Sequence, residues 1–390
     1  MNSTNEIELA LRKFVAPEYI FGIDARKMAP SYCKKLAAER VFIATDLGLQ
    51  KTIWLKELEQ SLQEEKIEYI IFNKISPNPR DYEVMQGAQV YLENKCNIIL
   101  AIGGGSVIDC AKGIGIVVTN NKHIGLFEGI DKIEKPTPPL ICIPTTGGTS
   151  ADVSQFAIIN NTTEKYKMAI ISKALVPDVA LIDPFVLQSM DAYLTACTGM
   201  DALCHAFEAY VSNANSPFTD LFALEAIKLI HENLLINIEK PENLQARGKT
   251  MLGSLYAGLA FSNASLGCVH SLAHSLGGYL DLPHGECNAI LLPHVVDYNF
   301  EYARDRYRKI AEILELPIFN LTENQQKKKL IEYLINFKNS VNIVYTLNNK
   351  GVNAGIIPAL AQKAIKDPCN ATNPKAPNKS DLETIYKEAL

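Results

Sequence analysis

The sequence predicts an α/β domain with a parallel sheet, followed by an all-α domain. Short apolar runs alternate with helical patterns in the first half of the chain, as in strands joined by crossover helices. After Asp183-Pro184 the pattern becomes helical almost to the C-terminus. Because 390 residues fit two or three domains, we place the two domains at 1–187 and 188–390.

The elements of the first domain follow from continuous apolar runs, which fit strands buried on both faces of a sheet. Four such strands are expected, at Val41–Thr45, Tyr69–Phe72, Ile98–Ile102 and Leu140–Ile143. Three helices are expected between them, at Ile53–Lys66, Asp81–Asn94 and Ser106–Val118. A more β-rich stretch follows, with strands expected at Phe156–Asn160, Lys167–Ile171 and Val179–Ile182.

The composition of the chain indicates which classes of partner are disfavoured and in which cell compartment the protein is expected. The net charge of −5 is too mild to indicate nucleic acid or an anionic membrane surface as a partner. Nine cysteines are scattered singly without a CxxC pair, and the N-terminus lacks the apolar core of a secretory signal, so we expect a cytoplasmic protein. Residues 250–280 contain no Asp, Glu, Lys or Arg, but Ser, Asn, Gly and two His interrupt them, which favours buried helices over a membrane span.

A glycine-rich turn, Gly103-Gly104-Gly105-Ser106, joins the expected strand 98–102 to the next helix. Glycines allow a ligand to approach the backbone closely, and a helix N-terminus offers free N–H groups, so a diphosphate fits this turn. Ser106 and Asp109 also match a capping-box pattern, so Asp109 fits either a structural cap or a cofactor contact.

Two further strand ends carry polar residues. Asp46 ends the first strand, where a carboxylate can bind a ribose diol and repel a 2′-phosphate, although a helix or turn cap is the more common local explanation. The segment Pro144-Thr145-Thr146-Gly147-Gly148-Thr149 ends another strand with hydroxyl groups and glycines. It fits a second wall of a nucleotide cleft, and it also fits a plain turn.

Four of the seven histidines fall within the 25 residues 270–294. His270 and His274 are four residues apart, and Asp201 and His205 repeat this spacing in an apolar helical segment, so each pair projects from one helix face. His284 follows Pro283. One carboxylate and three imidazoles suit a divalent first-row metal such as Fe²⁺ or Zn²⁺, whereas a lone buried histidine is more often structural.

Together these motifs resemble the iron-containing (group III) alcohol dehydrogenase family over nearly the whole chain. The segments that carry the resemblance are TD at 45–46, NP at 78–79, GGGSVIDCAK at 103–112, PTTGGTSAD at 144–152, KMAI at 167–170, GMDALCHAFEAYVS at 199–212, AFSNASLGCVHSLAHSLGG through LPHGECNAILLPHV, and DPCNATNP at 367–374. The resemblance implies a dinucleotide-binding α/β domain followed by a helical metal-binding domain, the dehydroquinate synthase-like architecture.

The resemblance also implies roles for individual residues. The four metal ligands would be Asp201, His205, His270 and His284, and His274 would be a catalytic neighbour that does not bind the metal. The cofactor NAD(H) would be held by Asp46, Asn78, Gly103, Gly104, Gly105, Ser106, Asp109, Thr145, Thr146, Thr149 and Lys167, with Asp109 also counted as catalytic. The substrate pocket wall would include Phe261, Leu266 and Cys369.

The implied activity is metal-dependent hydride transfer between NAD(H) and a small primary alcohol or aldehyde, with Fe²⁺ favoured over Zn²⁺. A homo-oligomer, a dimer or higher, is expected. One departure concerns the substrate pocket: the family usually has TTAGTGSE where this chain has TTGGTSAD. Two other hypotheses are a dehydroquinate synthase-like lyase, which lacks the combined GMDALCHAFEAY and PHGECNA signatures, and a dehydrogenase-like regulatory or binding protein without strong catalytic activity.

Overall fold

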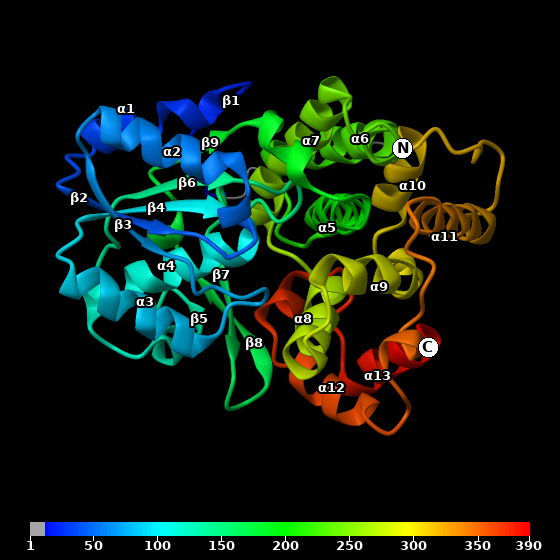
Figure 1. The fold of residues 1–390 in the computed structure, drawn as a ribbon. Helices are drawn as coiled ribbons and strands as arrows, with labels where there is room; N and C mark the ends of the chain where they lie inside the picture. Colours follow the sequence, from blue (N-terminus) through cyan, green and yellow to red (C-terminus); the bar gives the residue numbers. More distant parts are fainter. Residues whose placement is uncertain (1–11) are drawn as a thin grey trace.

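A six-stranded parallel sheet forms the core of the first half of the chain (Figure 1). The computed structural model describes residues 12–390. The strand order is β1-β9-β6-β4-β2-β3, and neighbouring strands are parallel throughout. The strands are β1 (Glu18–Phe21), β2 (Arg40–Ala44), β3 (Glu68–Phe72), β4 (Ile98–Gly103), β6 (Leu140–Pro144) and β9 (Val179–Ile182).

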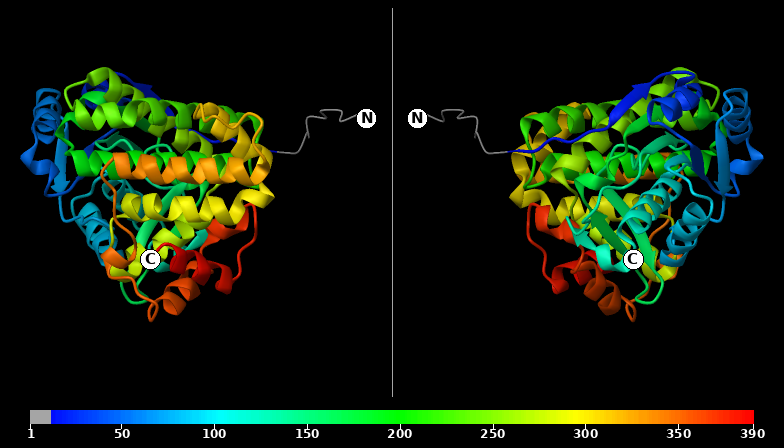
Figure 2. Two further views of the ribbon diagram at one scale, coloured as in Figure 1. Left: turned by 90° about the vertical axis from the view of Figure 1, so that its right-hand side faces the viewer. Right: turned by 90° about the vertical axis from the view of Figure 1, so that its left-hand side faces the viewer.

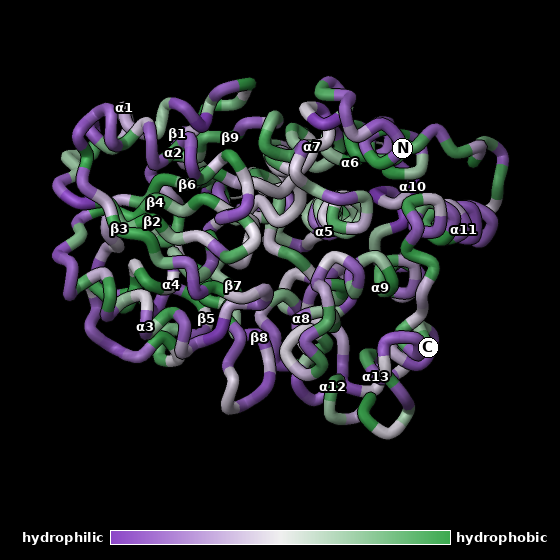
Figure 3. The backbone as a smooth tube through the Cα atoms, in the orientation of Figure 1, coloured by the Kyte–Doolittle hydropathy of each residue, from purple (hydrophilic) through white to green (hydrophobic). Residues whose placement is uncertain are grey.

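Helices cover both faces of this sheet, which explains why its central strands are continuously apolar. The helices are α1 (Ala29–Lys35), α2 (Ile53–Glu64), α3 (Asp81–Glu93) and α4 (Gly105–Asn120). Leu55 and Leu58 of α2 pack with Leu100 on one face, while Val84 of α3 packs with Ile99 on the other. The central strands are accordingly hydrophobic along their length (Figure 3). The predicted doubly covered α/β domain is therefore confirmed.

A small second sheet lies beside the parallel sheet. Its strand order is β5-β8-β7, and its strands are β5 (Gly129–Ile130), β7 (Phe156–Asn161) and β8 (Tyr166–Ile171). β7 and β8 form an antiparallel hairpin that projects next to α8 in Figure 1. The predicted strands at 156–160 and 167–171 are therefore present, and the hairpin brings Lys167 towards the helical half.

The second half is helical, as predicted. Its α-helices are α5 (Ala192–Val211), α6 (Pro217–Glu239), α7 (Leu244–Ala264), α8 (Cys268–Leu280), α9 (His284–Asn299), α10 (Arg304–Ile313), α11 (Glu323–Ser340), α12 (Ile357–Ala364) and α13 (Lys379–Glu388). In the left view of Figure 2 several long helices run side by side, with the C-terminal helices at the lower edge. α11 is mostly hydrophilic in Figure 3, which agrees with the Lys-rich pattern of its sequence.

Short 3₁₀ helices connect many of these elements. They are η1 (Ala25–Met28), η2 (Leu49–Lys51), η3 (Ile124–Phe127), η4 (Lys173–Leu175), η5 (Pro184–Ser189), η6 (Phe300–Tyr302), η7 (Asn348–Lys350) and η8 (Pro368–Thr372). The predicted domain boundary at residue 187 falls within η5, between the last strand of the parallel sheet and α5. The division into domains at this residue stays a prediction.

Two local features differ from the sequence expectation or extend it. The strand β1 is not expected from the sequence, because polar and apolar residues do not alternate along its four positions. Only its pairing with β9 makes this segment a strand. The capping box of Ser106 and Asp109 is wrong: Gly104 occupies the N-cap of α4, and no side chain caps this helix. The helix begins one residue earlier than expected because the glycines allow the chain to turn directly from β4.

Within residues 12–390, no single helix is long and apolar enough to cross a membrane. Taken together, α7 and α8 are long and apolar enough to span a membrane, judged by length and composition alone. The two helices are bent by 100° where they meet.

Candidate metal centre and cofactor groove

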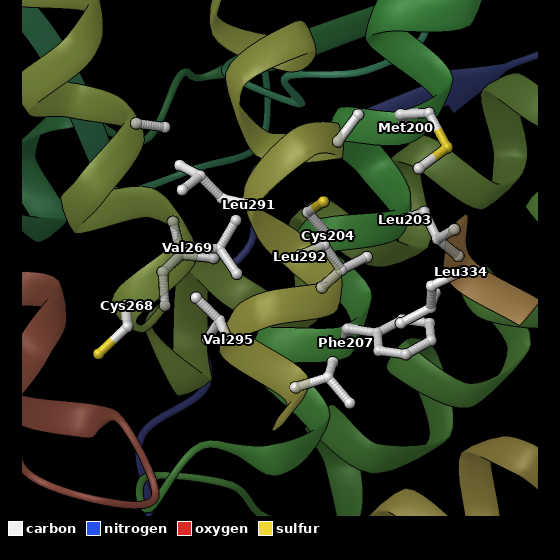
Figure 4. Close-up of a cluster of buried hydrophobic side chains, with 14 of the residues drawn as sticks. Met200, Leu203, Cys204, Phe207, Cys268, Val269, Leu291, Leu292, Val295 and Leu334 are labelled. Atoms are coloured by element: carbon white, nitrogen blue, oxygen red, sulfur yellow. The ribbon is translucent and has the colours of Figure 1, made fainter. Parts of the chain in front are cut away.

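Three helices bring together the four residues expected to bind a metal. Asp201 and His205 lie one turn apart on α5, His270 lies on α8, and His284 is the first residue of α9. Apolar side chains of the same helices, including Cys204, Val269 and Leu291, gather in the cluster shown in Figure 4. This packing fixes the three helices against one another. The side chains of Asp201, His205, His270 and His284, which lie on the same helices, are thereby brought close together.

The spacing of the four side chains fits one metal ion. Asp201 Oδ1 lies 3.7 Å from His270 Nε2, 3.7 Å from His284 Nε2 and 3.9 Å from His205 Nε2. A tetrahedral ion with bonds of about 2.1 Å separates its ligand atoms by about 3.4 Å. The ligand atoms of Asp201, His270 and His284 all lie within 4.8 Å of one another, whereas His205 is not part of this trio. Asp201, His270 and His284 therefore fit a divalent ion, and His205 approaches the same carboxylate from one turn further along α5.

Burial and mutual charges set the protonation of these groups. Burial opposes ionisation of Asp201, but the neighbouring imidazoles of His205 and His284 hold the pKa of its carboxyl well below the ordinary value. Burial lowers the pKa of His205 to about 3 and holds the pKa of His284 well below its usual range. An ionised carboxylate and neutral imidazoles are the forms that a metal requires.

His270 is held by a carboxylate that the sequence reasoning did not single out. Its Nδ1 lies 2.5 Å from Glu208 Oε2, and Glu208 Oε1 accepts a hydrogen bond from the backbone N–H of Val269. Burial alone would lower the pKa of His270, but Glu208 and Asp201 raise it to about 9, so a metal ion that binds here must displace a proton from this ring. Glu208 thus orients the ring so that Nε2 faces the other ligands. The available signal was its position seven residues after Asp201 on one helix.

His274 is oriented in a similar way by Asp367, another residue that the sequence reasoning missed. His274 Nδ1 lies 2.8 Å from Asp367 Oδ2, and Asp367 Oδ1 accepts from the backbone N–H of Cys369. Burial opposes ionisation of Asp367, but His274 lowers the pKa of its carboxyl below the ordinary value. The Cys369 side chain is fully buried next to this pair. The signal was the DPC motif itself, because Asp367 is the N-cap of η8.

The glycine-rich turn and the threonine segment lie against each other. A Cβ on Gly105 would meet Thr149 Oγ1 at 2.5 Å, and a Cβ on Gly104 would meet Thr146 Cγ2 at 3.2 Å. The backbone N–H of Thr145 donates to the carbonyl of Gly103. The glycines are therefore required by close packing, and they leave the N-terminus of α4 free to face a ligand.

A cavity of about 110 Å³ joins the expected cofactor residues to the expected metal ligands. Its wall contains Asn78, Gly105, Ser106, Asp109, Thr149, Lys167, Asp201, His205, Phe261, Leu266, His270, His274 and His284. Burial raises the pKa of Asp109 to about 6, against the opposing charges of Lys112 and Lys167. The structure therefore brings together residues that are up to 206 positions apart in the sequence.

The remaining predicted residues lie outside this cavity wall. Asp46 accepts a hydrogen bond from the backbone N–H of Leu49 at 2.9 Å, so its carboxylate does cap a turn. Gly103, Gly104, Thr145 and Thr146 support the turn behind the wall, and Cys369 lies behind His274. The ribose and substrate-wall roles of Asp46 and Cys369 stay predictions.

The departure in TTGGTSAD has a local explanation. Ser150 has a positive φ of 48°, a conformation that favours glycine, which the family usually has there. The Ser150 hydroxyl donates to the carbonyl of Ser254 on α7 at 2.6 Å, so the side chain is held away from the cavity. Asp152 is buried as well, and burial raises the pKa of its carboxyl to about 6. Both substitutions lie behind the cavity wall.

Comparison with known proteins identifies the family. Residues 16–184 match the description "Iron-containing alcohol dehydrogenase", and residues 195–390 match "Fe-containing alcohol dehydrogenase family, C-terminal". The first match covers the parallel sheet, and the second covers the helices that carry all four candidate metal ligands, which together place the chain in a class of metal-dependent oxidoreductases. The chain belongs to the iron-containing alcohol dehydrogenase family, as the sequence resemblance predicted, and is an oxidoreductase of the alcohol dehydrogenase type.

Individual relatives cover nearly the full chain. It is 38% identical to a 1,3-propanediol dehydrogenase of Klebsiella pneumoniae, covering 95% of this chain and 96% of the relative. It is 35% identical to an NAD-dependent methanol dehydrogenase of Bacillus methanolicus, covering 97% and 99%. A solved structure of a 1,3-propanediol oxidoreductase superposes with a TM-score of 0.94 at 37% identity, covering 98% of this chain and 100% of the other.

Proposed function

We propose that this protein interconverts small primary alcohols and aldehydes with NAD(H) and one divalent metal held by Asp201, His205, His270 and His284. The observation that supports this most strongly is the shared cavity, whose wall contains both the helix N-terminus at Gly105-Ser106 and the four ligand candidates. When bound, a divalent metal acts as a Lewis acid towards a substrate oxygen, and the nicotinamide carries the hydride.

The residues of this chain have separate roles in binding the cofactor and enclosing the substrate. The free N–H groups of the turn Gly103-Gly104-Gly105-Ser106 hold the pyrophosphate, supported by Asn78, Thr145, Thr146 and Thr149. Asp46 binds the adenosine ribose and favours NAD(H) over NADP(H). Asp109 and Lys167 lie on the nicotinamide side. Phe261, Leu266 and Cys369 bound the substrate, and Phe261 and Leu266 exclude water from the reacting centre because both are buried apolar side chains.

His274 exchanges a proton with substrate or solvent in this proposal. Its Nδ1–H donates to Asp367, which fixes the ring and leaves Nε2 as the nitrogen available for proton exchange. Asp109 assists on the cofactor side, where the elevated pKa of its carboxyl allows it to carry a proton near neutral pH.

The identity of the metal, the cell compartment and the oligomeric state are proposed from the chemistry and arrangement of the residues. One carboxylate and three imidazoles suit Fe²⁺, which we favour, as well as Zn²⁺. A cytoplasmic location agrees with nine free cysteines, all of them buried. We propose a homo-oligomer, a dimer or higher, because β1 lies at one edge of the sheet and can pair with a second copy. Neither nucleic acid nor a membrane is proposed as a partner.

The proposal is tested with purified protein, a panel of small aldehydes, NADH and NADPH, and elemental analysis of the bound metal. We expect NADH oxidation that requires both an aldehyde and about one divalent ion per chain. Loss of NADH oxidation with every aldehyde, despite a bound metal, would favour a regulatory or binding protein instead.

His270→Ala tests the ligand assignment directly. We expect metal content and activity to fall together, with activity reduced at least ~100-fold, since a ligand and its Glu208 support are both lost. His123→Ala is the matched control, because His123 is exposed and lies outside the cavity wall. Full metal content with near-normal turnover in His270→Ala would contradict the assignment.

A further inference from the structure

The first turn of α9 carries a ligand candidate without a side-chain cap to hold it. His284 is the first residue of this helix, and the N-cap residue Pro283 makes no side-chain hydrogen bond to the turn. With 22% of its side chain exposed, His284 is less buried than the other three ligand candidates, whose side chains are at most 5% exposed. The end of an uncapped helix frays because its first N–H groups have no partner within the helix. The position of His284 therefore depends on the other contacts that anchor this turn.

Glu286 lies in the same turn, and its carboxylate is buried. Its side chain is 1% exposed, and neither oxygen accepts a hydrogen bond of normal geometry from the described residues. Within residues 12–390 its one ion pair joins Oε1 to Lys350 Nζ at 2.7 Å, while Tyr193 of α5 also faces the carboxylate. Because a buried carboxylate needs a compensating charge, the ammonium group of Lys350 keeps Glu286, and with it this turn, in place.

Lys350 is the last residue of η7, in the long segment between α11 and α12. Its Nζ also lies 4.2 Å from the ring centroid of Tyr345. The same segment is fastened to α11, where Lys338 Nζ donates to the carbonyl of Ile343 at 2.7 Å. The ion pair thus ties the first turn of α9 to an anchored segment. Neither Glu286 nor Lys350 is a ligand candidate, so the pair is compatible with a bound ion.

We propose that Glu286 and Lys350 are positioning residues that keep the first turn of α9 closed and thereby hold His284 on the ion. The inference rests on the proposed function, since it takes His284 as a ligand. It follows that opening of this turn limits release of the ion, because opening detaches His284 while the other ligands stay on their helices.

Breaking the pair from its two sides should have unequal effects. Removal of the Lys350 ammonium leaves a charged carboxylate buried without its ion-pair partner. Neutralising Glu286 instead releases a lysine that is 21% exposed and can turn its charge towards water. A purely steric role of the two side chains would not produce this asymmetry.

The experiment measures how fast Zn²⁺-loaded protein releases Zn²⁺ to a chromophoric chelator, at concentrations where the rate no longer depends on the chelator. Lys350→Met keeps the length of the side chain and removes its charge, and we expect release about 10-fold faster than in the wild type. Glu286→Gln should release Zn²⁺ only about 3-fold faster. The double variant should match Glu286→Gln, because no buried charge is then left unpaired.

Lys327→Met is the matched control on the same helix. Lys327 is 22% exposed, and its Nζ lies 2.6 Å from Oδ1 of Asp297, near the other end of α9. This variant should release Zn²⁺ at the wild-type rate. Hydrogen exchange of the Zn²⁺-loaded proteins, followed by mass spectrometry, should be faster over residues 284–288 in Lys350→Met and unchanged there in Lys327→Met.

The outcomes separate the inference from the proposed function. Wild-type release in Lys350→Met, unchanged exchange over this turn, an equal effect of Lys327→Met, or a double variant as fast as Lys350→Met would overturn the inference alone. If Lys350→Met does not fold, Glu286→Gln and Lys327→Met decide by the same two measurements. A wild-type protein that takes up neither Zn²⁺ nor Fe²⁺, or His284→Ala with full metal content, would overturn the proposed metal centre and the inference with it.

Discussion

At the scale of single residues, Asp46 carries two functions that a substitution can separate. Its carboxylate caps a turn through the N–H of Leu49, and we propose that it also selects NAD(H). Asp46→Asn keeps a carbonyl oxygen for the turn and removes the charge. The ratio of NADH to NADPH efficiency should therefore fall about 10-fold, corresponding to ~1.4 kcal/mol. Steady-state kinetics with both cofactors measure this ratio, and an unchanged ratio at normal stability would leave only the turn cap.

Glu208 offers a second prediction at the residue scale. Glu208→Gln keeps an acceptor for Val269 N–H but replaces the charged acceptor of His270 Nδ1–H. We expect metal affinity to fall about 10- to 100-fold, as for other carboxylates that orient a ligand histidine. Chelator competition measures the affinity, and circular dichroism checks the fold. Wild-type affinity in this variant would show that packing alone orients His270.

At the scale of elements, the contact between the N-terminus of α4 and the threonine segment determines the shape of the pyrophosphate site. Gly105→Ala would place a methyl group 2.5 Å from Thr149 Oγ1 and push the two segments apart. We expect the Kd for NADH to rise at least ~10-fold and stability to fall by about 1–3 kcal/mol.

The matched control for Gly105→Ala is Gly248→Ala on α7. The nearest atoms to a Cβ at Gly248 are 3.9 Å away, an ordinary contact. This helical substitution should leave NADH binding unchanged and stabilise the protein by up to ~1 kcal/mol. NADH fluorescence titration and thermal unfolding distinguish the two variants. Unaltered NADH binding in Gly105→Ala would place the pyrophosphate elsewhere.

At the scale of the whole molecule, one carboxylate connects the two halves across the groove. Asp281, which follows α8, accepts from Asn78 Nδ2 at 2.7 Å and pairs with Arg80 at 3.0 Å. Asn78 in turn donates from its backbone N–H to Ser106 Oγ. Asp281→Gly suits the backbone φ of 55° and should speed NADH release several-fold, while stability changes by at most ~1 kcal/mol because Asp281 is exposed.

Stopped-flow fluorescence of NADH release measures this effect. Asp131→Gly is the matched control, since Asp131 is exposed and has a similar φ of 51° next to the small sheet. Its NADH release should match that of the wild type. Equal release rates in Asp281→Gly and wild type would mean that the bridge across the groove does not limit cofactor exchange.

Much of the fold was predictable because its signals are local. The strands β2, β4 and β6 read as unbroken apolar runs because helices cover both faces of the sheet. The strand β1 escaped detection because four half-exposed residues carry no such pattern, and only pairing with β9 makes them a strand. The predicted capping box at Ser106 failed because the glycine turn already starts α4, so its pattern was coincidental.

The sequence by itself determined the family, the order of elements and the candidate ligands, because i, i+4 pairs and glycine turns are short-range patterns. Only the tertiary structure showed that Glu208, Asn288 and Asp367 face His270, Asp201 and His274. Hydrogen bonds between residues 62 to 93 positions apart depend on how helices pack, and helix packing is decided by the buried core. The ligands of the candidate metal centre can therefore be recognised from short sequence patterns, whereas the residues that orient them are brought into place only by the packing of the helices.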